Sequence, residues 1–245
     1  MRSFIKVLLF AVLVAGTGYG MANPRTAART KAAEVVDRHL SGFNAVNVAG
    51  PFDVDIVQGA TESVKVEAPA DVIDRIITEV NGGVLKIYNR HDSWNWGEWW
   101  GHHKKILVHV TAKDLNSINI TGSGDVSFRE GITTNSLKLR ISGSGDMTGK
   151  LAVKTLESSI TGSGDMKLSG RAESSTVSLV GSGDFTARNL ITVSSAVRVS
   201  GSGDAEINAS EKVDAAVNGS GDIRYTGAAK NINSRKSGSG DISRN

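Results

Sequence analysis

The tetrapeptide Gly-Ser-Gly-Asp occurs seven times in this chain of 245 residues. Successive copies are separated by about 19 residues, with small differences from one interval to the next. A repeat of this length is typical of a solenoid, in which each repeat forms one coil and stacks on its neighbour. We therefore expect the tetrapeptides to lie one above another along a single edge. The copies begin at Gly122, Gly143, Gly162, Gly181, Gly201, Gly219 and Gly238.

Apolar and polar residues alternate on both sides of each tetrapeptide. The second residue before each copy is aliphatic in all but the last, and the alternation continues after each Asp. A period of two indicates strands with their apolar side chains inward. The predicted fold class is all-β, a parallel β-helix or solenoid with two short strands per coil. By the crossover rule we expect it to be right-handed. The aliphatic column is Ile120, Ile141, Ile160, Leu179, Val199 and Val217, followed by Lys236.

The tetrapeptide has the residue types that a sharp corner requires. Glycine adopts positive φ without a Cβ penalty, and Asp accepts hydrogen bonds from local backbone amides in an Asx-type turn. Stacked carboxylates about 4.8 Å apart repel by roughly 0.9 kcal/mol in water. Backbone amides, cations such as Lys167 and Arg224, or bound cations could offset this repulsion. We favour amides over calcium, which needs six to eight oxygen ligands. The predicted structural turn residues are Asp125, Asp146, Asp165, Asp184, Asp204, Asp222 and Asp241.

The N-terminus has the pattern of a secretory signal peptide over residues 1–22. Arg2 and Lys6 flank the start, an apolar run covers residues 7–15, and small residues precede a cleavage point after Ala22. The run is too short to span a bilayer, so no membrane span is expected after processing. The chain has no cysteine, and hence no lipid-attachment thiol. We expect a bacterial protein that is periplasmic, secreted or on the cell surface.

The mature chain is predicted to be one solenoid domain over residues 43–245. Residues 23–42 are expected to form a tether or a short helix. Residues 43–117 are expected to form degenerate N-terminal coils that cap the seven regular repeats of residues 118–245. Gly50-Pro-Phe-Asp53 looks like a degenerate first corner, and a hairpin is predicted around Asn81-Gly-Gly83.

A tryptophan-rich segment interrupts the N-terminal region at residues 91–103. It holds all four tryptophans and three of the five histidines. Clustered aromatic rings are typical of contact surfaces, but they could equally cap the open end of the solenoid. A third interpretation is a metal site on its histidines with Asp92 or Glu98. Our candidate ligand-binding residues are Trp94, Trp96, Trp99, Trp100, His102 and His103, and the metal alternative adds His91.

No pattern of catalysis is found in the chain. There is no cysteine nucleophile, no Gly-x-Ser-x-Gly elbow and no phosphate loop. The column Lys167, Thr186, Glu206 and Arg224 looks like an ordinary solvated surface. Positive and negative residues are interspersed, which disfavours a nucleic-acid partner. We expect no enzyme activity, no cofactor and no metal.

The repeated corner and three N-terminal segments carry a family resemblance. The segments are Val48–Ile56, Gly83–Ile87 and Leu115–Ile120. Together with the corners, the chain resembles the head GIN domain of auto-transporter adhesins over residues 43–245. The resemblance implies a two-sheet β-superhelix without the catalytic residues of pectin-lyase-type helices, and a role in cell adhesion. We expect an exported, adhesion-like module that binds an envelope or host-surface ligand such as a glycan. The alternatives are a carbohydrate-active β-helix enzyme, either lyase or hydrolase, and a purely structural periplasmic scaffold.

Overall fold

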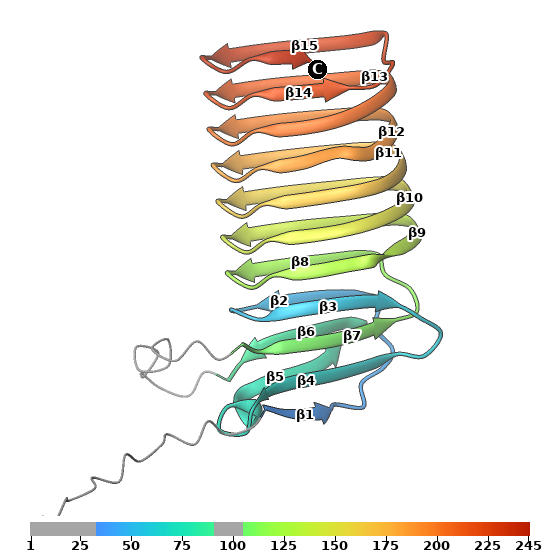
Figure 1. Cartoon of the computed structure of the whole chain (residues 1–245), viewed down its shortest axis with the longest axis vertical. Coiled ribbons are helices and arrows are strands. Elements are labelled where there is room, and N and C mark those ends of the chain that lie inside the picture. Colours follow the sequence, from blue (N-terminus) through green and yellow to red (C-terminus); the bar gives the residue numbers. More distant parts are fainter. Residues whose placement is uncertain (1–32, 91–104) are drawn as a thin grey trace, which may run out of the picture. The chain divides into compact units, whose positions relative to one another are not determined.

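The Gly-Ser-Gly-Asp repeats form successive coils of a parallel β-solenoid in the computed structural model (Figure 1). The structure describes residues 33–90 and 105–245. The predicted signal peptide and the tryptophan-rich segment 91–103 lie outside the described residues. The corners follow one another down one side of the stack, as predicted for coils of nearly constant length (Figure 1).

Five long strands make up the regular coils. Each begins directly after one Asp and ends at the first glycine of the next tetrapeptide. The pairing continues through the bend in the middle of the coil, where Ala152 lies beside Arg171. The two predicted strands of a coil are therefore two arms of one bent strand, here called the first arm (after the Asp) and the second arm. The strands are β9 (Val126–Gly143), β10 (Met147–Gly162), β11 (Met166–Gly181), β12 (Phe185–Gly201) and β13 (Ala205–Gly219).

The last coil is divided into shorter strands. β14 (Ile223–Thr226) and β15 (Asn231–Gly238) both pair with β13, and β16 (Ile242–Arg244) pairs with β14. All eight residues of β15 are exposed, because no further coil covers them within the described residues.

The core is a set of apolar columns between the two arms. Parallel pairing places equivalent residues of successive coils side by side, such as Met147, Met166 and Phe185. These side chains are fully or almost fully buried. Burial of branched aliphatic and aromatic surface, at roughly 25 cal/mol per Å², is the main force that holds the coils together. The predicted alternation of inward and outward residues is confirmed.

The N-terminal region continues the stacking of the two arms. β2 (Ala45–Ala49) and β3 (Asp53–Gln58) form a coil beneath β8 (Ser117–Gly122) and the first arm of β9. Gly50 lies against Gly122, which confirms the degenerate first corner. The next coil is made of β6 (Val84–Asn89) and β7 (Leu107–Ala112), which pair with β2 and β3 respectively.

Antiparallel strands close this end of the solenoid. β4 (Ser63–Pro69) pairs with β7, and β5 (Ile76–Asn81) pairs with β6 through the predicted hairpin. A short 3-10 helix, η1 (Ile73–Arg75), precedes β5. The irregular N-terminal β region that we expected as a cap is therefore present.

The expectation of a tether or short helix before residue 43 is wrong for its described part. Ala33–Asp37 forms β1, which pairs antiparallel with β4. The adjacent Val35 and Val36 favour extended backbone, and the free edge of β4 supplies the hydrogen-bonding partners. Val36 also packs against the core.

Candidate functional site

Each corner is held to its neighbour by a fixed set of hydrogen bonds. The carbonyl of Gly143 accepts the N–H groups of Ser163 and Gly164 from the next coil, at 2.9 and 3.2 Å. This arrangement leaves the N–H of Asp165 without a backbone acceptor. The carboxylate of Asp146 accepts it instead, over 2.9 Å. A side-chain oxygen thus completes the backbone ladder at the point where the corner interrupts it.

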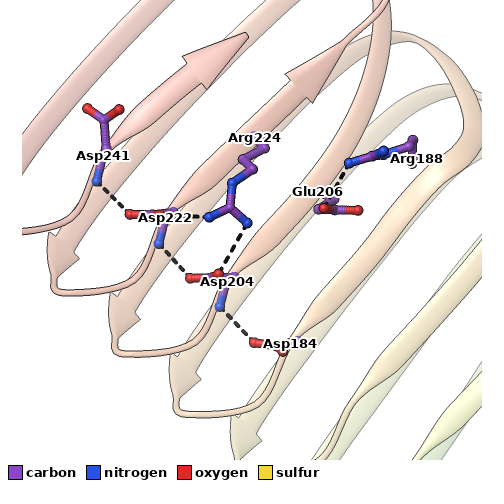
Figure 2. Close-up of polar contacts among 7 residues, drawn as sticks. All are labelled: Asp184, Arg188, Asp204, Glu206, Asp222, Arg224 and Asp241. Atoms are coloured by element: carbon purple, nitrogen blue, oxygen red, sulfur yellow. Dashed lines mark hydrogen bonds and ion pairs between the residues drawn. The ribbon is translucent and has the colours of Figure 1, made fainter. Parts of the chain in front are cut away.

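The same carboxylate-to-amide bond joins all seven predicted turn residues into one continuous file. Its six links are 2.8 to 3.0 Å long, and Figure 2 shows the last three of them. The prediction that these carboxylates are amide-bonded is confirmed for the six from Asp125 to Asp222, but the expected local Asx-type partner is wrong. The donor is the equivalent Asp of the next coil, 18 to 21 residues further along the chain. Each carboxylate lies along the stacking direction, where that amide is the nearest unpaired donor.

Cationic side chains lie beside the end of this file. Arg224 donates to Asp222 over 2.9 Å and to Asp204 over 3.4 Å, so one guanidinium joins two coils (Figure 2). Lys236 contacts Asp241 at 3.3 Å. The side chains of these ion pairs are about a third exposed or more. Each ion pair therefore contributes at most about 1 kcal/mol to the stability of the fold. Of the two cations named from the sequence, Arg224 contacts the file, whereas Lys167 has no ion pair among the described residues.

The glycines show why the corner accepts no larger residues. A Cβ on Gly162 would collide with the carbonyl oxygen of Gly143, and a Cβ on Gly164 with that of Gly145. Gly162 also has a φ of 126°, which side chains disfavour. The corners are therefore closed by backbone and carboxylate alone. In the described part of the chain, no three acidic or histidine residues are grouped so as to hold a metal ion.

The tryptophan-rich segment is inserted at one corner position. In the β2–β3 coil the corner connects Ala49 to Asp53; in the neighbouring coil their partners are Tyr88 and Leu107. In this neighbouring coil, the chain between Tyr88 and Leu107 therefore takes the place of the short corner. The candidate residues Trp94, Trp96, Trp99, Trp100, His102 and His103 fall within it, outside the described residues, as do those of the metal alternative.

Both ends of this insertion are fixed to the fold. The N–H of Arg90 donates to the carbonyl of Arg75 over 2.9 Å. On the other side, Lys105 forms an ion pair with Asp53 at 3.0 Å, and the N–H of Asp53 donates to the carbonyl of Ile106 over 3.0 Å. The insertion therefore starts and ends on the edge that carries the Asp file, next to its degenerate first corner.

A second surface feature was not predicted from the sequence. Lys167 and Thr186 line a depression on the first arms of β9 to β12, together with Arg129, Lys150 and Arg188. The sequence pattern favoured an ordinary solvated surface for Lys167 and Thr186, and it did not single out the other three residues. The unequal repeat intervals were the only sequence signal that could have indicated an irregular surface here.

The fold and these features define a parallel β-solenoid with backbone-closed corners and a loop inserted at one of them. The chain belongs to the family described as "Putative auto-transporter adhesin, head GIN domain", whose profile matches residues 42–229. The resemblance noted in the sequence is therefore confirmed. None of the curated proteins matches the chain.

Solved structures from Bacteroides and its relatives share this architecture. A putative adhesin of Bacteroides fragilis is 26% identical, with a TM-score of 0.80 over 88% of this chain and 98% of that one. A putative adhesin of Parabacteroides distasonis is 25% identical, with a TM-score of 0.72 over 88% and 98%. A putative lipid binding protein of the same organism, 22% identical with a TM-score of 0.69 over 87% and 97%, shares the fold.

The family and the Bacteroides fragilis structure support an adhesion-like module as the general class. Within the described ranges, no helix has the length and apolar character needed to cross a lipid bilayer.

Proposed function

We propose that this protein is an exported surface module that binds a ligand and carries out no chemistry on it. The observation that carries the proposal is the insertion of a tryptophan-rich segment at a corner of a regular solenoid. A corner needs only the few residues between Ala49 and Asp53, as the coil above shows. Loops that carry binding residues are commonly held by a rigid scaffold of this kind.

The ligand contacts are assigned to the insertion itself. Trp94, Trp96, Trp99 and Trp100 supply large apolar faces, and His102 and His103 supply polar groups. This composition suits a glycan of the envelope or of a host surface, because indole faces pack against sugar rings. Membership of an adhesin family supports the same role.

Tryptophan emission tests the proposal directly, since every tryptophan of the chain lies in the insertion. We expect a peptidoglycan fragment or an oligosaccharide from a panel to quench or shift the emission, and Trp96→Ala to abolish both this change and the binding measured by calorimetry. Val35→Ala, an exposed change on β1, serves as a control that should keep the full response. A panel in which calorimetry detects no ligand would refute the proposal.

The cap interpretation predicts a different outcome of the same experiment. If the rings only cover the solenoid end, Trp96→Ala lowers the unfolding temperature and leaves glycan binding unchanged. A lyase would instead release unsaturated ends that absorb in the ultraviolet when the protein is incubated with polyuronates. We expect no such absorbance.

Export is tested by fractionating the native bacterium. We expect the mature protein to begin at Asn23 and to occur in the periplasm, at the surface or in the medium. A full-length chain in the cytoplasm would contradict this part of the proposal.

A further inference from the structure

A depression of about 260 Å³ lies on the outer face of the solenoid, across the first arms of four successive coils. Its buried lining residues are Gly149 of β10 and Leu168 of β11. Both belong to the shorter coils, in which successive Asp residues are 19 residues apart, Asp146 to Asp165 and Asp165 to Asp184.

Extra residues in the flanking coils explain why the surface is hollow at this place. In β9, the three residues Arg129–Gly131 stand opposite Lys150 alone. In β12, Ala187 and Arg188 stand opposite Leu168 alone. These β-bulges occur in the coils whose successive Asp residues are 21 and 20 residues apart. A bulge bends its strand and redirects side chains, so the two longer coils form the walls.

In the part of the chain that the structure describes, the depression is lined by four cations and by no carboxylate. Each of the four strands contributes one cation: Arg129, Lys150, Lys167 and Arg188. Arg188 is held by Glu206 at 3.0 Å, from the coil beyond the wall (Figure 2). Among the described residues, the other three make no ion pair. Concentrated positive charge that is only partly neutralised attracts anions, because field lines focus in a concave surface.

We propose that this depression, here called the basic groove, binds an acidic polysaccharide. The cations occur on adjacent strands about 4.8 Å apart, so the row extends roughly 14 Å along the solenoid. A single phosphate or carboxylate would contact only part of such a row, whereas a chain of charged sugars presents an anion in each unit or two. Hydroxyl and amide groups of Thr148, Ser169, Thr186 and Asn189 lie between the cations and suit sugar hydroxyls.

The basic groove is separate from the tryptophan-rich insertion. It lies on β9 to β12, whereas the insertion connects β6 and β7. The inference therefore does not rest on the proposed function, and either one can fail without the other.

The test measures binding of oligosaccharides of alginate, a polymer of uronic acids, by calorimetry at low and moderate salt. We expect binding that weakens with salt and that falls about tenfold or more in Lys150→Gln/Lys167→Gln. The matched control is Lys154→Gln/Arg198→Gln, which removes the same charge from β10 and β12 outside the basic groove. The control should bind as the unmodified protein does, and Trp96→Ala should leave this binding unchanged.

Three outcomes would overturn the inference. One is equal loss in the test and control variants, which would indicate attraction by net charge alone. Another is equal binding of uncharged dextran. A third is tighter binding of a single-stranded DNA oligonucleotide of equal charge, which would assign the basic groove to nucleic acid. A comparison of dextran sulfate with alginate shows whether the basic groove prefers sulfate or carboxylate groups. Either preference supports the proposal, because both polymers are acidic polysaccharides.

Discussion

The carboxylate of Asp165 accepts the backbone N–H of Asp184 over 2.8 Å, and these two residues occupy the same corner position in adjacent coils. The bond explains why Asp follows Gly-Ser-Gly in every repeat. A corner turns one N–H out of the ladder, and an unpaired donor costs free energy. A side chain from the coil below supplies the acceptor, and the coil above repeats the arrangement.

Two substitutions of Asp165 distinguish the contribution of the hydrogen bond to stability from the contribution of the negative charge. Asp165→Ala removes the acceptor of the Asp184 N–H and should lower the free energy of unfolding by about 1 kcal/mol. Asp165→Asn keeps an oxygen acceptor and relieves repulsion within the file, so its stability should stay within about 0.5 kcal/mol of the unmodified protein. Chemical denaturation measures both. Equal destabilisation by Asn and Ala would show that the negative charge matters more than the acceptor.

The corner glycines should differ sharply from a glycine in an open turn. Gly181 has a φ of 129°, and a Cβ there would collide with the carbonyl oxygen of Gly162. We expect Gly181→Ala to cost about 3 kcal/mol or more. Gly82 also has a positive φ, 59°, but an added Cβ meets nothing within 4 Å.

Gly82→Ala is therefore the matched control, with an expected cost of about 1 to 2 kcal/mol from backbone conformation alone. Thermal unfolding of the two variants compares them. Similar costs at both positions would contradict the close stacking of the corners.

Phe128 and Gly149 are paired neighbours whose sizes are complementary. The Phe128 ring occupies the space that a side chain on Gly149 would need. Gly149→Ala should cost about 1 to 3 kcal/mol by overpacking, and Phe128→Ala about 3 to 5 kcal/mol by leaving a cavity. In the double variant the new methyl group enters the vacated space, so the cost should be less than the sum. Strict additivity would mean that these residues do not share the space.

Ser158 is a polar residue in a column that is otherwise apolar from Leu139 to Ala215. It lies between Leu139 and Val177 and is 1% exposed, and its hydroxyl has no hydrogen-bond partner among the described residues. Ser158→Ala removes an unpaired buried group and should raise the free energy of unfolding by about 1 kcal/mol.

Ser195 provides the contrast, because its hydroxyl lies 2.9 Å from that of Thr192. Ser195→Ala breaks this bond and should lower stability by a similar amount. The denaturation midpoints of both variants measure these changes in stability. A loss of stability in Ser158→Ala would indicate that the Ser158 hydroxyl has a hydrogen-bond partner.

Much of the fold follows from the constant spacing of one motif. Parallel pairing places residues one interval apart side by side, so the alternation around each Asp predicts both the columns and their burial. The file of Asp residues follows from the same argument. The prediction of a local donor to the Asp146 carboxylate was wrong because an Asx-type turn involves only amides close in sequence. The amide that needs an acceptor belongs to Asp165 of the next coil.

The basic groove could not be predicted in this way. The unequal intervals between tetrapeptides show that two of these coils are longer, but a length does not say where in the coil the extra residues lie. Only the strand register places them at Arg129 and Arg188, on either side of Lys150 and Lys167. Strand β1 was missed for a related reason, since its partner β4 lies about 30 residues further along the chain.

The hydrogen bond between successive Asp residues can be measured most directly by nuclear magnetic resonance. Scalar coupling across a hydrogen bond links the donor nitrogen to the carbon of the accepting group. For the backbone nitrogen of Asp184, we predict a coupling to the carboxyl carbon of Asp165, with slow exchange of the Asp184 amide proton despite its exposed corner. Absence of this coupling, together with carboxyl shifts at the file on addition of calcium, would contradict the account.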